Sequence, residues 1–159
     1  MPKSLKISTV VFVGGLLIGA SAGAHHSFTQ FDRETELVTT ATVVRWEFNN
    51  PHSWLRVNIE NDDGTETLWS FEGSAPPSLI RRGITGATFE PGDTITLMYC
   101  RMLDGRPAGH MGWALFDDGT LINPSDGGCN SDDASMERWM RWLDAGFTSN
   151  KEALAAGAE

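Results

Sequence analysis

Residues 53–72 read SWLRVNIENDDGTETLWSFE, two alternating segments joined by a turn. In the first segment three aliphatic residues recur at every second position and so share one face of a strand: Leu55, Val57 and Ile59. Asp62-Asp63-Gly64 supplies the short polar and flexible residues of a tight turn. In the second segment Trp69 and Phe71 share a face. The stretch therefore predicts a β-hairpin of strands 53–60 and 66–72.

The sequence on either side of this hairpin predicts further strands and a short helix. Alternating apolar residues indicate strands over 38–48, 94–103 and 111–116. Pro76-Pro77 opens a short helical segment, because proline suits the first turn of a helix, and Gly83 ends it. This order is that of a mainly β, five-stranded, OB-like Greek-key barrel with the short helix between strands 3 and 4. A small β-sandwich is the alternative that strand order leaves open.

A different period appears near the C-terminus. Four apolar residues recur at i, i+3, i+4 and i+7, the spacing of an amphipathic helix: Met136, Trp139, Met140 and Leu143. Ser131, Asp132 and Asp133 offer N-caps and favourable negative charge at its start. We expect a C-terminal helix over about 132–145, packed on strand 94–103. Met98 and Met102 form a matching apolar patch on that strand.

The N-terminal residues have the composition of a cleaved secretory signal. Lys3 and Lys6 form a short positive segment before an apolar run over 7–18, and Ala22-Gly23-Ala24 forms a small-residue cleavage site. A membrane anchor is the rival interpretation, but the run is shorter than the roughly 20 apolar residues that span a bilayer. We therefore expect a periplasmic or secreted protein without a stable membrane anchor after cleavage behind Ala24.

These patterns divide the chain into four parts. We expect a signal peptide at 1–24, an N-terminal arm at 25–37, a β-barrel domain at 38–123, and a C-terminal loop and helix at 124–159. The whole chain carries 12 basic and 21 acidic residues, for a formal net charge of −9. This balance argues against nucleic acid as a partner, since nucleic-acid binding requires a basic surface.

The chain has two cysteines, Cys100 and Cys129. An even number of cysteines in a protein outside the cytoplasm favours a disulfide bond. Such a bond would hold the C-terminal helix beside strand 94–103. The alternative is a free Cys100 thiol that joins Met98 and Met102 in a site for a soft metal such as Cu(I).

Histidines cluster at the predicted mature N-terminus. Cleavage behind Ala24 makes His25 the first residue, whose α-amine and ring nitrogen would chelate Cu(II) together. His26 or His52 would complete a brace of three nitrogen atoms. We therefore name His25, His26 and His52 as candidate metal ligands and copper as the candidate cofactor. The alternative is an exposed, flexible terminus whose imidazoles bind no physiological metal.

His52 and Trp54 indicate a second candidate surface. By strand alternation Trp54 lies opposite the inward Leu55, on the outer face of the barrel. Barrels of this type bind ligands on the face formed by strands 2 and 3. We expect Trp54 to contact a small ligand or another exported protein there. The alternative is that His52 stabilises a turn and Trp54 packs under the N-terminal arm.

Several short motifs occur together between residues 25 and 122. They include His25-His26-Ser27-Phe28, Asn50-Pro51-His52-Ser53-Trp54, Trp69-Ser70-Phe71-Glu72-Gly73 and Arg81-Arg82-Gly83. In this combination the chain resembles a family of uncharacterised exported bacterial proteins, catalogued as a domain of unknown function. The resemblance implies export and carries no activity.

The sequence gives little support for catalysis. No serine stands in a nucleophile-elbow pattern, and the chain has neither a C-x-x-C zinc pair nor a C-x-x-C-H haem site. We name no catalytic residue. The expected function is that of an exported binding or accessory protein, with copper at the mature N-terminus as its ligand. The alternative is a non-metal module that binds a small ligand or another exported protein on the outer barrel face.

Overall fold

The computed structural model describes residues 28–158. Its strands are β1 (Phe31–Glu47), β2 (Ser53–Glu60), β3 (Glu66–Gly73), β4 (Thr94–Met102), β5 (Ala108–Phe116) and β6 (Leu121–Ile122). Its helices are the 3-10 turn η1 (Phe28–Gln30), α1 (Pro76–Arg81), α2 (Asp133–Asp144) and α3 (Asn150–Ala155). Within 28–158 no helix is long and apolar enough to cross a membrane. The predicted signal peptide, His25 and His26 lie outside the described residues.

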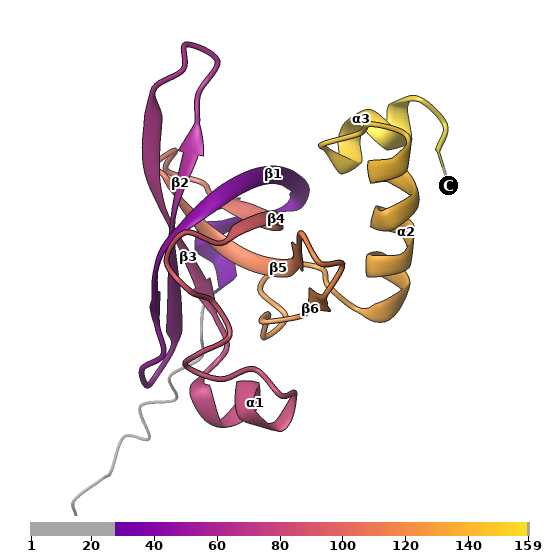
Figure 1. Ribbon diagram of the computed structural model, residues 1–159. Coiled ribbons are helices and arrows are strands. Elements are labelled where there is room, and N and C mark those ends of the chain that lie inside the picture. Colours follow the sequence, from indigo (N-terminus) through magenta and orange to yellow (C-terminus); the bar gives the residue numbers. More distant parts are fainter. Residues whose placement is uncertain (1–27, 159) are drawn as a thin grey trace, which may run out of the picture.

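Strands β1 to β5 form a closed barrel (Figure 1). Hydrogen-bonded neighbours follow the order β3-β2-β1-β4-β5, and each of these pairs is antiparallel. A parallel pairing of β3 with β5 joins the two ends of this order through Ser70↔Ala108, Phe71↔Gly109 and Glu72↔His110. The mainly β, five-stranded OB-like barrel predicted from the sequence is confirmed, with α1 after β3 and helices at the C-terminus.

The long strand β1 pairs with two different strands of the barrel along its length. Its residues 31–42 pair with β4, and residues 42–47 pair with β2. It begins at Phe31, inside the segment 25–37 that the sequence pattern assigns to an arm. One strand therefore connects the N-terminal segment directly to the barrel.

A β-bulge between Val43 and Arg45 overturns one expectation about β1. Strict alternation predicts Val44 and Trp46 on one face and Val43 on the other. In the structure Val43 is buried and Trp46 packs against the same core, whereas Val44 is 41% exposed. The prediction that Val44 faces the same side as Trp46 is wrong because a bulge inserts one residue and reverses the alternation.

The barrel interior is filled by side chains from all five strands. Leu55 and Val57 are fully buried, as the alternation in the hairpin predicts. The loop after α1 contributes Phe89, and α1 itself lies across one end of the barrel (Figure 1). The buried cluster consists of Ala41, Val43, Leu55, Val57, Phe71, Phe89, Ile95, Leu97, Tyr99, Met111 and Ala114.

A second apolar cluster holds the C-terminal helices against the outer face of β4 and β5. Met98 and Met102 are buried in it, as expected, together with Trp139 from α2. The buried face of α2 differs in one respect from the predicted stripe, because Trp142 is buried as well. Met136, Met140 and Leu143 are only partly buried at its margin. The two indoles meet edge to face, with ring centroids 5.1 Å apart.

The predicted disulfide bond joins Cys100 on β4 to Cys129, a few residues before α2. The two Cα atoms lie 5.5 Å apart, and both side chains are fully buried. Neither cysteine of the chain is free. Oxidation therefore removes the thiol that the alternative soft-metal site at Cys100 requires.

A buried polar contact fixes α2 relative to β1. Nε1 of Trp139 donates a hydrogen bond to Oε2 of Glu36 at 2.6 Å. The backbone N–H of Glu36 donates to Oδ1 of Asn150 at 3.1 Å, at the start of α3. Ser149 caps α3 and forms a bridge with Leu37. The last residues therefore pack on β1 as a short helix that no pattern in the sequence predicts.

Removal of the disulfide tests how strongly the C-terminal helices depend on it. We expect Cys100→Ala/Cys129→Ala to lower the free energy of unfolding by about 3–4 kcal/mol, because the bond closes a loop with a sequence separation of 29. Urea titration followed by tryptophan fluorescence measures the change. A reducing agent should destabilise the wild type by a similar amount and leave the double variant unchanged. Equal stability of both proteins would contradict the expectation.

Candidate functional site

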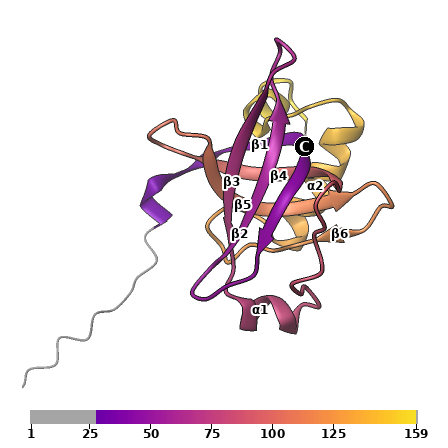
Figure 2. The same cartoon turned by 60° about the vertical axis from the view of Figure 1, so that its left-hand side comes forward.

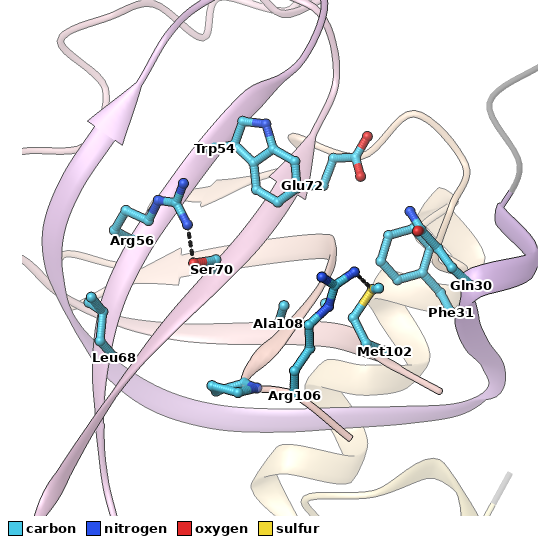
Figure 3. A pocket seen from close by; sticks show the side chains of 12 residues that line it. Gln30, Phe31, Trp54, Arg56, Leu68, Ser70, Glu72, Met102, Arg106 and Ala108 are labelled. Atoms are coloured by element: carbon cyan, nitrogen blue, oxygen red, sulfur yellow. Dashed lines mark hydrogen bonds between the residues drawn. The ribbon is translucent and has the colours of Figure 1, made fainter. Parts of the chain in front are cut away.

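A cleft of about 520 Å³ opens on the outer face of β2 and β3, beside the start of β5 (Figure 3). Leu55 and Val57 point inward, so alternation turns Trp54 and Arg56 outward into the cleft. Leu68, Ser70 and Glu72 do the same from β3. Figures 1 and 2 show β2 and β3 on the side of the barrel opposite α2. Trp54 thus lies on the predicted outer face, and its contact with a ligand stays a prediction.

Arg56 is held in the cleft by three neighbours. Its guanidinium carbon lies 5.5 Å from the ring centroid of Trp54, within cation–π range. Its Nε lies 3.4 Å from Oε1 of Glu47, and its Nη1 donates to Oγ of Ser70. The side chain is 34% exposed. These contacts restrict the rotamers of Arg56 and keep a cation at the surface of the cleft.

Arg106, in the loop before β5, forms another wall of the cleft (Figure 3). Its Nε lies 3.3 Å from Oδ2 of Asp104, and its Nη2 lies 3.9 Å from the sulfur of Met102. The side chain is 60% exposed. Phe31 and Met102 are buried and also line the cleft. The cleft therefore combines two guanidinium groups with an aromatic and aliphatic surface.

His52 occupies the end of this face, and its ring pairs with a carboxylate. Its Nδ1 is hydrogen-bonded to Oε1 of Glu72, which lies directly across the hairpin from Trp54. Both side chains are only about a tenth exposed. Glu72 stands isolated in the sequence, and hairpin register brings it to His52.

A second histidine–carboxylate pair lies next to the first. His110 is fully buried, and its Nε2 lies 2.7 Å from Oδ1 of Asp126. Its Nδ1 lies 2.9 Å from the carbonyl oxygen of Met111. Both ring nitrogens of His110 therefore have a hydrogen-bonding partner within the chain. The rings of Phe28 and Phe31 meet His110 edge to face, with centroids 5.5 and 5.3 Å away.

The loop that carries Asp126 is tied to the barrel on both sides. Nη1 of Arg82 donates to the carbonyl oxygens of Asn123 and Ser125, at 2.8 and 2.7 Å. Cys129 follows and forms the disulfide. Burial opposes ionisation of Asp126. The hydrogen bond from His110 and the charges of His110 and His52 outweigh burial and hold the pKa of this carboxyl below its ordinary value.

These groups suit ligand contacts better than metal coordination. Among residues 28–158 no group of three or more His, Cys, Asp and Glu side chains is arranged to hold a metal ion. Of the three candidate ligands, His52 is described and bonded to Glu72, while His25 and His26 lie outside the described residues. The copper site stays a prediction.

Residues 15–111 match a model of a protein family, the family of unknown function DUF6152. The chain belongs to the DUF6152 family. The matched region includes the hairpin, Arg106 and His110 and ends before Asp126, Cys129 and α2. The resemblance to a family of unknown function is thus confirmed, and the export that it implied stays a prediction. Comparison with curated proteins gave no significant match, and neither did comparison with solved structures.

Sequence reasoning missed two parts of this DUF6152 site. Arg106 lies in the predicted turn after the fourth strand, and nothing in its local pattern separates it from an ordinary solvated arginine. The Glu72 partner of His52 was accessible in principle, because the turn at 62–64 sets the register that pairs Trp54 with Glu72.

The His110–Asp126 pair makes the stability of the fold depend on pH. The pKa of Asp126 is lower in the folded chain than in the unfolded one. Its carboxylate therefore stabilises the fold above the unfolded value, and this contribution is lost as the pH falls through the folded value. We expect Asp126→Asn to cost about 1–3 kcal/mol at neutral pH and to flatten the acid side of the stability profile.

Urea unfolding at a series of pH values measures this effect. Asp117→Asn is the matched control, because Asp117 is an exposed aspartate on the turn after β5 and should leave the profile unchanged. A profile of Asp126→Asn parallel to that of the wild type would show that the pair contributes nothing to acid sensitivity.

Proposed function

We propose that this protein is an exported binding module whose ligand occupies the cleft on the outer face of β2 and β3. The observation that carries the proposal is the pair of oriented guanidinium groups, Arg56 and Arg106, in one cleft with the partly buried Trp54. Ligand sites are typically concave and largely apolar, with a few placed polar groups, and the cleft has this composition. Export is supported by the signal-like N-terminus and by the buried disulfide.

The arrangement of polar groups favours binding over catalysis. Ser70 is the hydroxyl that lines the cleft, and its Oγ accepts a hydrogen bond from Arg56. A serine nucleophile requires a histidine or carboxylate base within hydrogen-bonding distance. Within the described part of the chain no such base bonds to Ser70, and Glu72 is engaged by His52. The cleft is thus equipped to hold a ligand.

Binding at the cleft can be tested with a fragment library and the protein beginning at His25. We expect hits to shift NMR resonances of the Trp54 indole and of residues near Ser70 and Ala108. Trp54→Ala and Leu68→Ser should weaken those hits about tenfold, because each removes apolar contact area. Leu154→Ser is the matched control, since Leu154 is 60% exposed on α3 and Leu68 is 53% exposed in the cleft. Hits that shift resonances elsewhere, or whose affinity is unchanged by both cleft substitutions, would refute the proposal.

Copper binding by His25, with His26 or His52, is the second candidate. The described chain begins at Phe28, whose ring packs on His110. Glu72 and His110 are partners in the β3–β5 pairing, so the two histidine–carboxylate pairs lie close to each other and to Phe28. His25 and His26 precede this segment in the sequence, and the proposal rests on their place at the predicted mature N-terminus.

A titration with Cu(II) tests this second candidate on protein whose first residue has been verified as His25 by intact mass. We expect one equivalent to bind with nitrogen ligands visible by electron paramagnetic resonance. His25→Ala should change the spectrum and weaken binding at least tenfold. A chain extended by one glycine before His25 is the control, because it moves the α-amine away from the ring. Unchanged affinity in both proteins would remove copper from consideration.

A further inference from the structure

The two cleft arginines retain hydrogen-bond donors that their protein partners do not use. A guanidinium carries five N–H groups in a planar fork. The contacts of Arg56 within residues 28–158 involve Nε and Nη1, which leaves Nη2 for a ligand. Those of Arg106 in the same range involve Nε and Nη2, which leaves Nη1. Each arginine is thus held in place and still offers N–H groups at the cleft surface.

The positions of these donors favour an acidic group as the ligand's polar end. Figure 3 shows the guanidinium groups of Arg56 and Arg106 on either side of Ser70 and Ala108. A carboxylate has two acceptor oxygens, so one oxygen can accept from Nη2 of Arg56 and the other from Nη1 of Arg106, in charge-assisted hydrogen bonds. A neutral ligand would leave these charge-assisted hydrogen bonds unmade.

The surrounding charges limit how much negative charge the ligand carries. Glu47 and Asp104 lie close to Arg56 and Arg106 and offset part of their charge. Glu72 adds a further carboxylate at the cleft, paired with His52. The whole chain has a formal net charge of −9. A single negative charge finds complementary donors here, whereas a dianion such as a phosphate monoester meets repulsion from the nearby acids.

The remaining walls of the cleft favour a ligand whose other part is apolar. Trp54 presents an indole on the outer face of β2, and Leu68 is 53% exposed on β3. The guanidinium of Arg56 lies over the Trp54 indole, so Trp54 contributes to the apolar wall through the part of its ring that Arg56 leaves uncovered. A volume of about 520 Å³ lies within the range of pockets that hold small organic molecules. One or two fused rings with a short acidic side chain would fill such a cleft.

We infer that the cleft binds apolar monocarboxylates, with the carboxylate held by Arg56 and Arg106 and the apolar body against Trp54 and Leu68. This inference rests on the proposed function of the cleft and adds the chemical class of its ligand. It also gives a reason why two arginines line the same cleft and why an acidic residue of the chain holds each of them in place.

Indole-3-acetate is a suitable probe, and indole-3-acetamide is its neutral counterpart of the same shape. We expect calorimetry to show that the acid binds at least tenfold more tightly than the amide, since charge-assisted hydrogen bonds exceed neutral ones. Raising the salt concentration from 50 to 300 mM (about a 2.5-fold shorter screening length) should weaken binding of the acid and leave the amide unaffected. Phenyl phosphate should bind more weakly than phenylacetate.

Variants of the two arginines assign the carboxylate contact. Arg56→Gln and Arg106→Gln should each weaken indole-3-acetate about tenfold, with little effect on the amide. Arg56→Lys keeps the charge and loses the planar fork, so its affinity should fall between those of the wild type and Arg56→Gln. Arg138→Gln is the matched control, because Arg138 stacks on Trp142 at 5.1 Å, outside the cleft. Circular dichroism and thermal unfolding verify that each variant is folded.

The outcomes separate the ligand class from the function of the cleft. Equal affinity for the acid and the amide, with both lost in Trp54→Ala, would overturn the preference for a carboxylate. The proposal that the cleft binds a ligand would still stand. Tighter binding of phenyl phosphate than of phenylacetate would overturn the inference that the ligand carries a single negative charge. If no probe shifts cleft resonances while fragments of other chemistry do, the inferred class is wrong and the proposed function stands. Fragments that map away from the cleft would overturn both.

Discussion

The parallel pairing of β3 with β5 closes the barrel, and it depends on how closely β5 approaches its two neighbours. A Cβ atom at Gly109 would lie 2.6 Å from the carbonyl oxygen of Cys100 and 3.2 Å from the ring of Phe71. Glycine avoids both clashes, so β5 fits between β3 and β4. The same pairing brings Arg106, which precedes β5, to the cleft that Arg56 lines, and sets His110 beside Glu72. Closure of the barrel and assembly of the cleft therefore follow from one contact.

The two faces of the barrel differ because only one of them is covered. The disulfide and the indoles of Trp139 and Trp142 seal α2 onto β4 and β5. This side therefore buries much of its apolar surface within the chain. The outer face of β2 and β3 lies opposite, as Figures 1 and 2 show, and keeps Trp54 and Leu68 at its surface. The cleft on the open face can thus receive a ligand without displacing part of the protein.

Acidic residues in this protein orient its cations as well as setting its net charge. Glu47 contacts Arg56, Asp104 contacts Arg106, and Glu72 contacts His52. Side chains held in this way lose less conformational entropy when a ligand binds. Partly exposed ion pairs contribute little to stability, so their main effect is to position the cations. This arrangement supports a cleft organised for recognition of one charged group on a largely apolar molecule.

The sequence by itself determined the strands of the hairpin 53–72, the outward direction of Trp54, the amphipathic helix and the pairing of the cysteines. These features depend on the period of the apolar residues, on the turn residues, and on the even cysteine count in a chain with a signal-like N-terminus. All of these can be read from short stretches of sequence or from composition. The tertiary structure alone decided the bulge that brings Val43 and Trp46 to the same core, and the placement of Arg56 and Arg106 in one cleft across the closure of the barrel. No local pattern encodes these, because they arise where strands distant in the chain pair and their side chains compete for the same space.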